Sequence, residues 1–202
     1  MSVIIHVPHA GDSMPAELME SVVVPLREFR HLHEKMKDDG VMSVVSQAFG
    51  DVQLITFAVS RLLCDVERFI GDGEVMERYG MGFCYEKAYN GRKIKNVTPE
   101  LRERTLRYYR SHHLRLDSAV SAGKSILLID LHSFGEELMM PDRRDGSRAM
   151  PEICIGADDV FTPAFLTARA ERLFAAAGFT VAVNYPYSGS MVQRRPSGKN
   201  GL

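Results

Sequence analysis

The sequence lacks several features that define common classes of protein. Its 202 residues include no Trp and only three cysteines, Cys64, Cys84 and Cys154, which form no CxxC pair. Their odd number and wide spacing argue against a disulfide framework, and indicate reduced thiols in a cytoplasmic protein. The formal net charge is −1, so nothing in the charge balance points to nucleic acid or to an anionic membrane as a partner.

Long apolar runs are also missing. No stretch is long enough to span a bilayer, and the N-terminus lacks the basic and apolar regions of a secretory signal. Apolar residues make up 45% of the chain and charged residues 25%, which is an ordinary balance for a globular protein. The length suffices for a domain with a sizeable core.

What is present is an alternation of strand and helix patterns. Short apolar runs predict strands at Val3–Val7, Gln53–Val59 and Ser125–Asp130, and shorter ones at 153–155 and 180–183. Helical periods follow Gly40, Thr98-Pro99 and Thr162-Pro163, the last with Gly178 just past its end. The alternation predicts an α/β fold, a three-layer domain with a mixed, mostly parallel sheet. We expect one domain over residues 1–190, and a disordered or altered tail over 191–202.

Two histidines close two of these strands. His9 lies in Val7-Pro8-His9-Ala10-Gly11, and His132 lies in Asp130-Leu131-His132-Ser133. Ligands of open α/β sheets bind beyond the carboxyl ends of the strands, where both histidines are placed. Either histidine alone is more simply explained as structural. Together they favour a zinc site, which when catalytic needs three protein ligands and one open position.

A third ligand would be a carboxylate or a histidine. Asp38 and Asp39 are available, just before Gly40 and the helix that follows it. Asp is also a common helix cap, and on spacing alone the capping role is the simpler explanation for both residues.

Other polar residues allow two explanations each. Arg61 and Arg68, with Asp65 between them, could capture a carboxylate or form a surface ion-pair cluster. Of His112 and His113, one should point inward from the long helix, as a hydrogen-bonded core histidine. Asp130 could orient a ligand or be a buried acid.

Five segments, taken in order, make the sequence similar to a known family. They are Val7-Pro8-His9-Ala10-Gly11, Ser60-Arg61-Leu62 with Asp65 and Arg68, Asp130-Leu131-His132-Ser133, Pro151-Glu152-Ile153-Cys154-Ile155-Gly156, and Asn184-Tyr185-Pro186-Tyr187-Ser188-Gly189. Together they resemble the N-formylglutamate amidohydrolase family. The resemblance implies a phosphorylase/hydrolase-like α/β fold related to the zinc carboxypeptidases. It also implies zinc-dependent hydrolysis of a small acidic N-acyl amino acid, the last step of one histidine-degradation route.

The resemblance also implies roles for single residues. One zinc ion would bind His9, Asp38 and His132, with Asp39 as the alternative carboxylate. The substrate would contact Arg61, Arg68, His113 and Asn184, and catalysis would involve Arg61, Asn184 and Tyr187.

One departure from the family concerns its general base. The family has a glutamate after the Asn-x-Pro-Tyr loop, but here no Glu follows Glu171. We therefore expect metal binding with weakened catalysis, with Glu136 and Glu137 as the only nearby acids that could substitute. We also expect an exposed apolar patch near Thr180–Val183, or a second copy of the chain that covers it. The alternatives are a metal- and carboxylate-binding protein without turnover, and a related deacylase or peptidase.

Overall fold

The structure is a computed structural model that describes residues 2–47, 52–71, 73–122, 126–135 and 148–189. It divides into two compact units, Met1–Phe134 and Gly135–Leu202, and each is described by itself. The expectation of one domain over residues 1–190 stays a prediction. The expected tail and the acids Glu136 and Glu137 lie outside the described residues.

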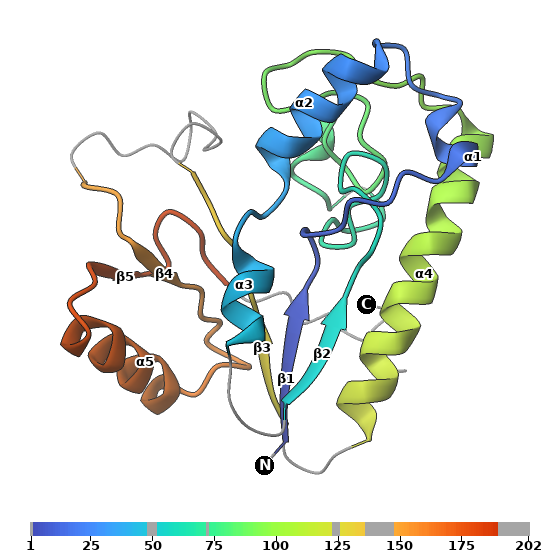
Figure 1. Cartoon of the computed structure of the whole chain (residues 1–202). Helices are drawn as coiled ribbons and strands as arrows, with labels where there is room; N and C mark the ends of the chain where they lie inside the picture. Colours follow the sequence, from blue (N-terminus) through green and yellow to red (C-terminus); the bar gives the residue numbers. More distant parts are fainter. Residues whose placement is uncertain (1, 48–51, 72, 123–125, 136–147, 190–202) are drawn as a thin grey trace. The chain divides into compact units, whose positions relative to one another are not determined.

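The elements alternate between strand and helix, as the sequence predicts (Figure 1). The first unit contains β1 (Ser2–Val7), α1 (Ala16–Met19), α2 (Leu26–Met36), α3 (Val41–Ser46), β2 (Val52–Thr56), the 3-10 helix η1 (Glu77–Tyr79), α4 (Pro99–Ser121) and β3 (Ile126–Asp130). The second unit contains β4 (Ile153–Ile155), α5 (Ala164–Ala176) and β5 (Val181–Val183).

All pairings between these strands are parallel. The sheet of the first unit has the order β2-β1-β3, so β1 is central, and the second unit pairs β4 with β5. Within this register His6 of β1 lies opposite Asp130 of β3. The parallel arrangement brings the carboxyl ends of the three strands to one edge, where His9 and His132 were expected.

Helices cover both faces of this sheet. Ile4 and Ile55 pack with Leu116 of α4 on one face. Ile5 and Val7 pack with Val41 of α3 on the other face. Successive residues of a strand point to opposite faces, so β1 is buried from both sides. The predicted α/β fold with three layers is confirmed in this unit.

Helix α2 was not predicted, although its sequence carries a signal. Pro25 precedes it, and the buried residues recur at spacings of three and four, which is the pattern of a helix with one apolar face. These buried residues are Phe29, Leu32, His33 and Met36.

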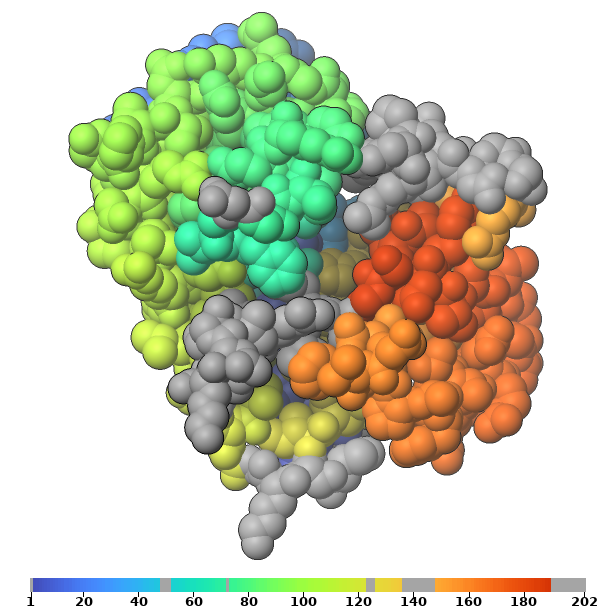
Figure 2. Space-filling view, turned by 180° about the vertical axis from the view of Figure 1, so that it is seen from behind, coloured from blue at the N-terminus to red at the C-terminus, as the bar shows by residue number. Residues whose placement is uncertain are grey.

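Helix α4 begins as the sequence predicts. The Thr98 hydroxyl accepts a hydrogen bond from the Leu101 amide (3.2 Å), and Pro99 fills the first helical position. The expectation that only one of His112 and His113 points inward is wrong, because both side chains are buried. In the space-filling view, the opposite side of α4 forms much of one face of the first unit (Figure 2).

The second unit also follows the predicted pattern. Helix α5 begins after Pro163, and Gly178 just past its end has a φ of +95°, a conformation that favours glycine. No residue of α5 is buried, and large apolar side chains such as Phe165 are exposed. Phe179, just before β5, is 44% exposed, and the expected apolar patch near Thr180–Val183 stays a prediction. Association of copies through it stays a prediction.

Among the described residues, no helix combines the length and the apolar character needed to cross a membrane.

The core against α4 can be tested with a matched pair of variants. Leu116→Ala should lower the free energy of unfolding by about 2–5 kcal/mol, because Leu116 is 7% exposed and packs on the sheet. Val120→Ala, on the same helix but 37% exposed, should cost less than about 1 kcal/mol. Urea denaturation of both variants provides the measurement, and equal losses would contradict the proposed packing.

Candidate functional site

The loops at the carboxyl edge of the sheet hold the polar residues together. The main chain of Asp38, between α2 and α3, donates to the His9 carbonyl (3.0 Å). Gly11 lies so close to the main chain after β2 that a Cβ there would be 2.4 Å from Ala58. Glycine is therefore required if the loop that carries His9 is to pack against Ala58.

The two histidines meet at Asp38. Their ring centroids are 5.1 Å apart. Asp38 Oδ2 lies 2.8 Å from His132 Nδ1 and 3.7 Å from His9 Nδ1. Asp39 is instead exposed, and its carboxylate accepts from the Gly40 amide (3.0 Å). Asp38 is thus the carboxylate that faces both histidines, and the capping explanation does not hold for it.

Asp65 fixes the other nitrogen of His9. Its carboxylate accepts from His9 Nε2 (2.9 Å), Arg61 Nη2 (2.9 Å), the Tyr85 hydroxyl (2.7 Å) and the Glu67 amide (2.9 Å). Because a carboxylate only accepts, His9 must carry a proton on Nε2. His9 Nδ1 is buried, and within the described part of the chain it has no hydrogen-bond partner.

The electrostatics keep both aspartates ionised. Burial alone would raise the pKa of Asp65, but the charges of His9, Arg61 and Arg68 hold it well below its usual value. Burial would likewise raise the pKa of Asp38, but the hydrogen bond from His132 and the charges of His9 and Arg61 hold it far below that value. Two ionised carboxylates therefore flank the histidines.

Two further acids lie beside His132: Asp130, which sequence analysis named as a possible orienting residue, and Glu67, which it missed. Glu67 Oε1 is 3.2 Å from His132 Nε2, and Asp130 Oδ1 is 3.7 Å from it. Burial would lower the pKa of His132, but the charge of Glu67 and the neighbouring carboxylates of Asp130 and Asp38 raise it well above its usual value. The expectation that Glu136 or Glu137 substitutes for the general base stays a prediction, because both residues lie outside the described part of the chain.

Several groups of side chains here could be considered as metal ligands, and one of them is His6, Glu67 and Asp130. His9 Nδ1, Asp38 and His132 Nδ1 form the set expected from sequence. His9, Glu67 and His132 form another, with ligand atoms all within 4.8 Å of one another. This last set would need His9 Nε2, which already donates to Asp65. The ligand set with Asp38 stays a prediction.

The arginines are part of the same cluster. Arg61 is not a surface residue: its side chain is 14% exposed, and Nη1 lies 3.7 Å from Asp38 Oδ1. Arg68 Nε lies 3.7 Å from Asp65 Oδ2. The Nε atoms of both arginines are buried without a hydrogen-bond partner among the residues described. A buried N–H group without an acceptor is costly, which suits a site that receives an anionic ligand.

The remaining predicted residues have other observed contacts. His113 Nε2 donates to the Val66 carbonyl (2.8 Å), which supports the loop that carries Asp65 and Glu67. Asn184 lies in the second unit, where its side-chain oxygen accepts from the Ala157 amide (2.8 Å). Tyr187 lies in the same loop. Their roles at the site stay predictions.

A line of buried polar groups runs from the site toward α4. Asp130 Oδ1 accepts from His6 Nδ1 (2.8 Å), and His6 Nε2 lies 2.8 Å from His112 Nε2. Burial, with the charges of His6 and His113, lowers the pKa of His112 to about 3. His112 is therefore neutral at pH 7. No sequence pattern indicates that these strand and helix residues meet.

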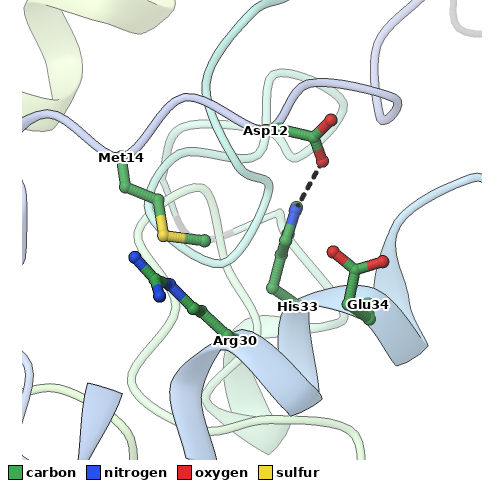
Figure 3. Close-up of a pocket in the computed structure, with 5 residues that line it drawn as sticks. All are labelled: Asp12, Met14, Arg30, His33 and Glu34. Atoms are coloured by element: carbon green, nitrogen blue, oxygen red, sulfur yellow. Dashed lines mark hydrogen bonds and ion pairs between the residues drawn. The ribbon is translucent and has the colours of Figure 1, made fainter. Parts of the chain in front are cut away.

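A second cluster of polar side chains lies in a surface hollow beside α2 (Figure 3). His33 Nε2 is 2.9 Å from Asp12 Oδ1, and Glu34 is close to both. The ammonium of Lys37 contacts Glu34 (2.7 Å) and Asp12 (3.4 Å). Lys37 thus already supplies the positive charge that these acids attract.

The parallel three-layer fold, with a histidine and carboxylate cluster at the carboxyl edge of its sheet, places the chain among the α/β enzymes. A model of the N-formylglutamate amidohydrolase family matches residues 1–201, and the chain belongs to this family.

Comparison with solved structures agrees on the fold. The crystal structure of N-formylglutamate amidohydrolase from Ralstonia eutropha JMP134 superposes with a TM-score of 0.78 at 21% identity. The match covers 93% of this chain and 74% of that one. Comparison with curated proteins gives no match.

The buried His112 should make stability depend on pH. The pKa of His112 is about 3 in the folded chain, against an ordinary value of 6.5. At a pH between these values, His112 is protonated in the unfolded chain but neutral in the folded chain. Stability should fall as pH drops below 6.5, by at most about 1.4 kcal/mol per pH unit from this group. Denaturant titrations at several pH values should show that the free energy of unfolding falls less steeply with decreasing pH in His112→Gln than in the wild type. The exposed His31→Gln should keep the wild-type slope, and equal slopes in all three proteins would refute the assignment.

Proposed function

We propose that the protein is a metal-dependent amidohydrolase that cleaves a small acidic N-acyl amino acid, with N-formylglutamate as the first substrate to test. One divalent ion of the zinc class would be held by His9, Asp38 and His132. The observation that carries the proposal is the buried, unpartnered Nδ1 of His9, which faces the carboxylate that also contacts His132 Nδ1.

The carboxylate of Asp38 lies close to one nitrogen of each histidine. Ligand atoms around a tetrahedral zinc lie about 3.3 Å from one another, given bonds of about 2.0–2.1 Å. Asp38 Oδ2 lies 2.8 Å from one histidine nitrogen and 3.7 Å from the other, on either side of that value. Donors of this kind, two imidazoles and a carboxylate, are typical of catalytic zinc.

The chain's own residues would bind and orient the substrate. Arg61 and Arg68 offer buried N–H groups to its carboxylates, and Arg61 lies beside the ligand Asp38. Asn184 and Tyr187 would shape the site and donate to the developing oxyanion. The bound ion would supply Lewis acidity toward the scissile carbonyl and activation of water. Hydrolysis breaks the amide C–N bond, with hydroxyl added to the acyl carbon and a proton to nitrogen.

The compartment is part of the same proposal. Cys64, Cys84 and Cys154 are all free thiols in the structure, which favours a reducing compartment such as the cytoplasm.

Asp38 and its neighbour form a matched test of the metal site. Asp38→Asn should reduce zinc affinity by more than about 100-fold and abolish formate release, because a proposed ligand is lost. Asp39→Asn should leave both unchanged, since Asp39 is exposed and contacts only the Gly40 amide among the contacts observed. Chelator competition and a formate-release assay on the same samples measure the two effects. Full metal without turnover in the wild type would indicate a binding protein.

Arg61 can be tested separately from the metal. Arg61→Lys keeps the charge but loses the planar fork, so KM for N-formylglutamate should rise by about tenfold or more with a smaller change in kcat. Arg92→Lys, at an exposed ion pair with Glu28, is the control and should behave as wild type. Unchanged kinetics in Arg61→Lys would remove Arg61 from substrate binding.

A further inference from the structure

The loop after β2 carries two carboxylates that reach the histidines of the site, and Glu67 contacts both of them, with its Oε2 3.5 Å from His9 Nε2. Asp65 Oδ1 lies 2.9 Å from His9 Nε2, and Glu67 Oε1 lies 3.2 Å from His132 Nε2. Both contacts involve the Nε2 atom, on the far side of each ring from the Nδ1 atoms that face Asp38. The two histidines are therefore held in the same way, by residues two positions apart.

The position of Glu67 is fixed by its own neighbours. Its amide donates to Asp65 Oδ1 (2.9 Å), and the Asp65 carboxylate is in turn fully buried and bonded to Arg61 and Tyr85. The Glu67 side chain is only 8% exposed. The main chain of Glu67 is thus anchored and its side chain is mostly buried, and a carboxylate so placed can select the orientation of an imidazole.

An imidazole that binds a metal through one nitrogen commonly donates its other N–H group to a carboxylate, which fixes the ring and its tautomer. Asp65 does this for His9. At His132 the matching acceptor is Glu67, while Asp130 Oδ1 is farther from the same nitrogen, at 3.7 Å.

We propose that Glu67 is a positioning residue of the metal site: it accepts the Nε2–H of His132 and so directs His132 Nδ1 toward the ion beside Asp38. The inference rests on the proposed function, because it assigns Glu67 a role at the same site. It also assigns Glu67 outside the ligand set, although its oxygens lie near both histidines.

Three variants separate these roles. Glu67→Gln keeps a side-chain oxygen that can accept from His132, whereas Glu67→Leu has a similar size but no acceptor. Glu74→Leu is the matched control, because Glu74 is another buried glutamate on a nearby loop whose carboxylate bonds only main-chain amides among the contacts observed, at Phe69 and Met76. Zinc affinity is measured by chelator competition, with Glu74→Leu expected to match wild type.

For a positioning role, Glu67→Leu should bind zinc about 10–100-fold more weakly than wild type, and Glu67→Gln should recover most of that loss. Equal losses in both variants would show that Glu67 acts as a ligand or only through its charge, and would overturn the proposal. Unchanged affinity in Glu67→Leu would overturn it as well.

A second measurement does not need the metal. In ¹⁵N spectra of the metal-free protein, His132 Nε2 should be protonated in wild type and Glu67→Gln, and should lose that proton in Glu67→Leu. An unchanged His132 spectrum in Glu67→Leu would overturn the proposal. Absence of zinc binding by the wild type would instead overturn the proposed function, so the two failures can be told apart.

Discussion

The carboxylate of Asp65 is the group on which the rest of the site depends. It is fully buried, and it accepts hydrogen bonds from His9, Arg61, Tyr85 and the Glu67 main chain. A buried charge is tolerated only when it is paired and hydrogen-bonded, so Asp65 requires these partners as much as they require it. One ionised group thus determines which nitrogen of a histidine is protonated, where a guanidinium lies, and where the next acid of the loop is placed.

This arrangement explains why so many charged groups can lie together under the surface. Histidines and arginines keep Asp38 and Asp65 ionised. Burial and the charge of Asp130 instead raise the pKa of Glu67. The acids differ in environment and therefore in proton affinity, and such perturbed pKa values are common at functional sites. The histidines lie between the two kinds of acid.

Much of the fold could be predicted from the sequence, because strand patterns, Thr98-Pro99 and Gly178 act locally. The positions of His9 and His132 followed from the same reasoning, since both close apolar strands. The roles of Glu67 and His6 could not be predicted. Glu67 reaches His132 from 65 residues away. His6 looked like an interior residue of a strand, and only the register of β1 with β3 brings it opposite Asp130. Sequence spacing also favoured a cap for Asp38, which only the three-dimensional contacts correct.

The pairing of His6 with Asp130 also bears on how the sheet can assemble. Apolar strands such as β1 and β3 would tolerate several alignments, because one branched aliphatic side chain packs much like another. A shift by one residue would turn His6 and the apolar residues of β1 toward the wrong faces, and would bury the imidazole away from both Asp130 and His112. A misaligned sheet would lose these polar contacts and is therefore less stable. The residues that support the site thus also select the alignment of β1 with β3.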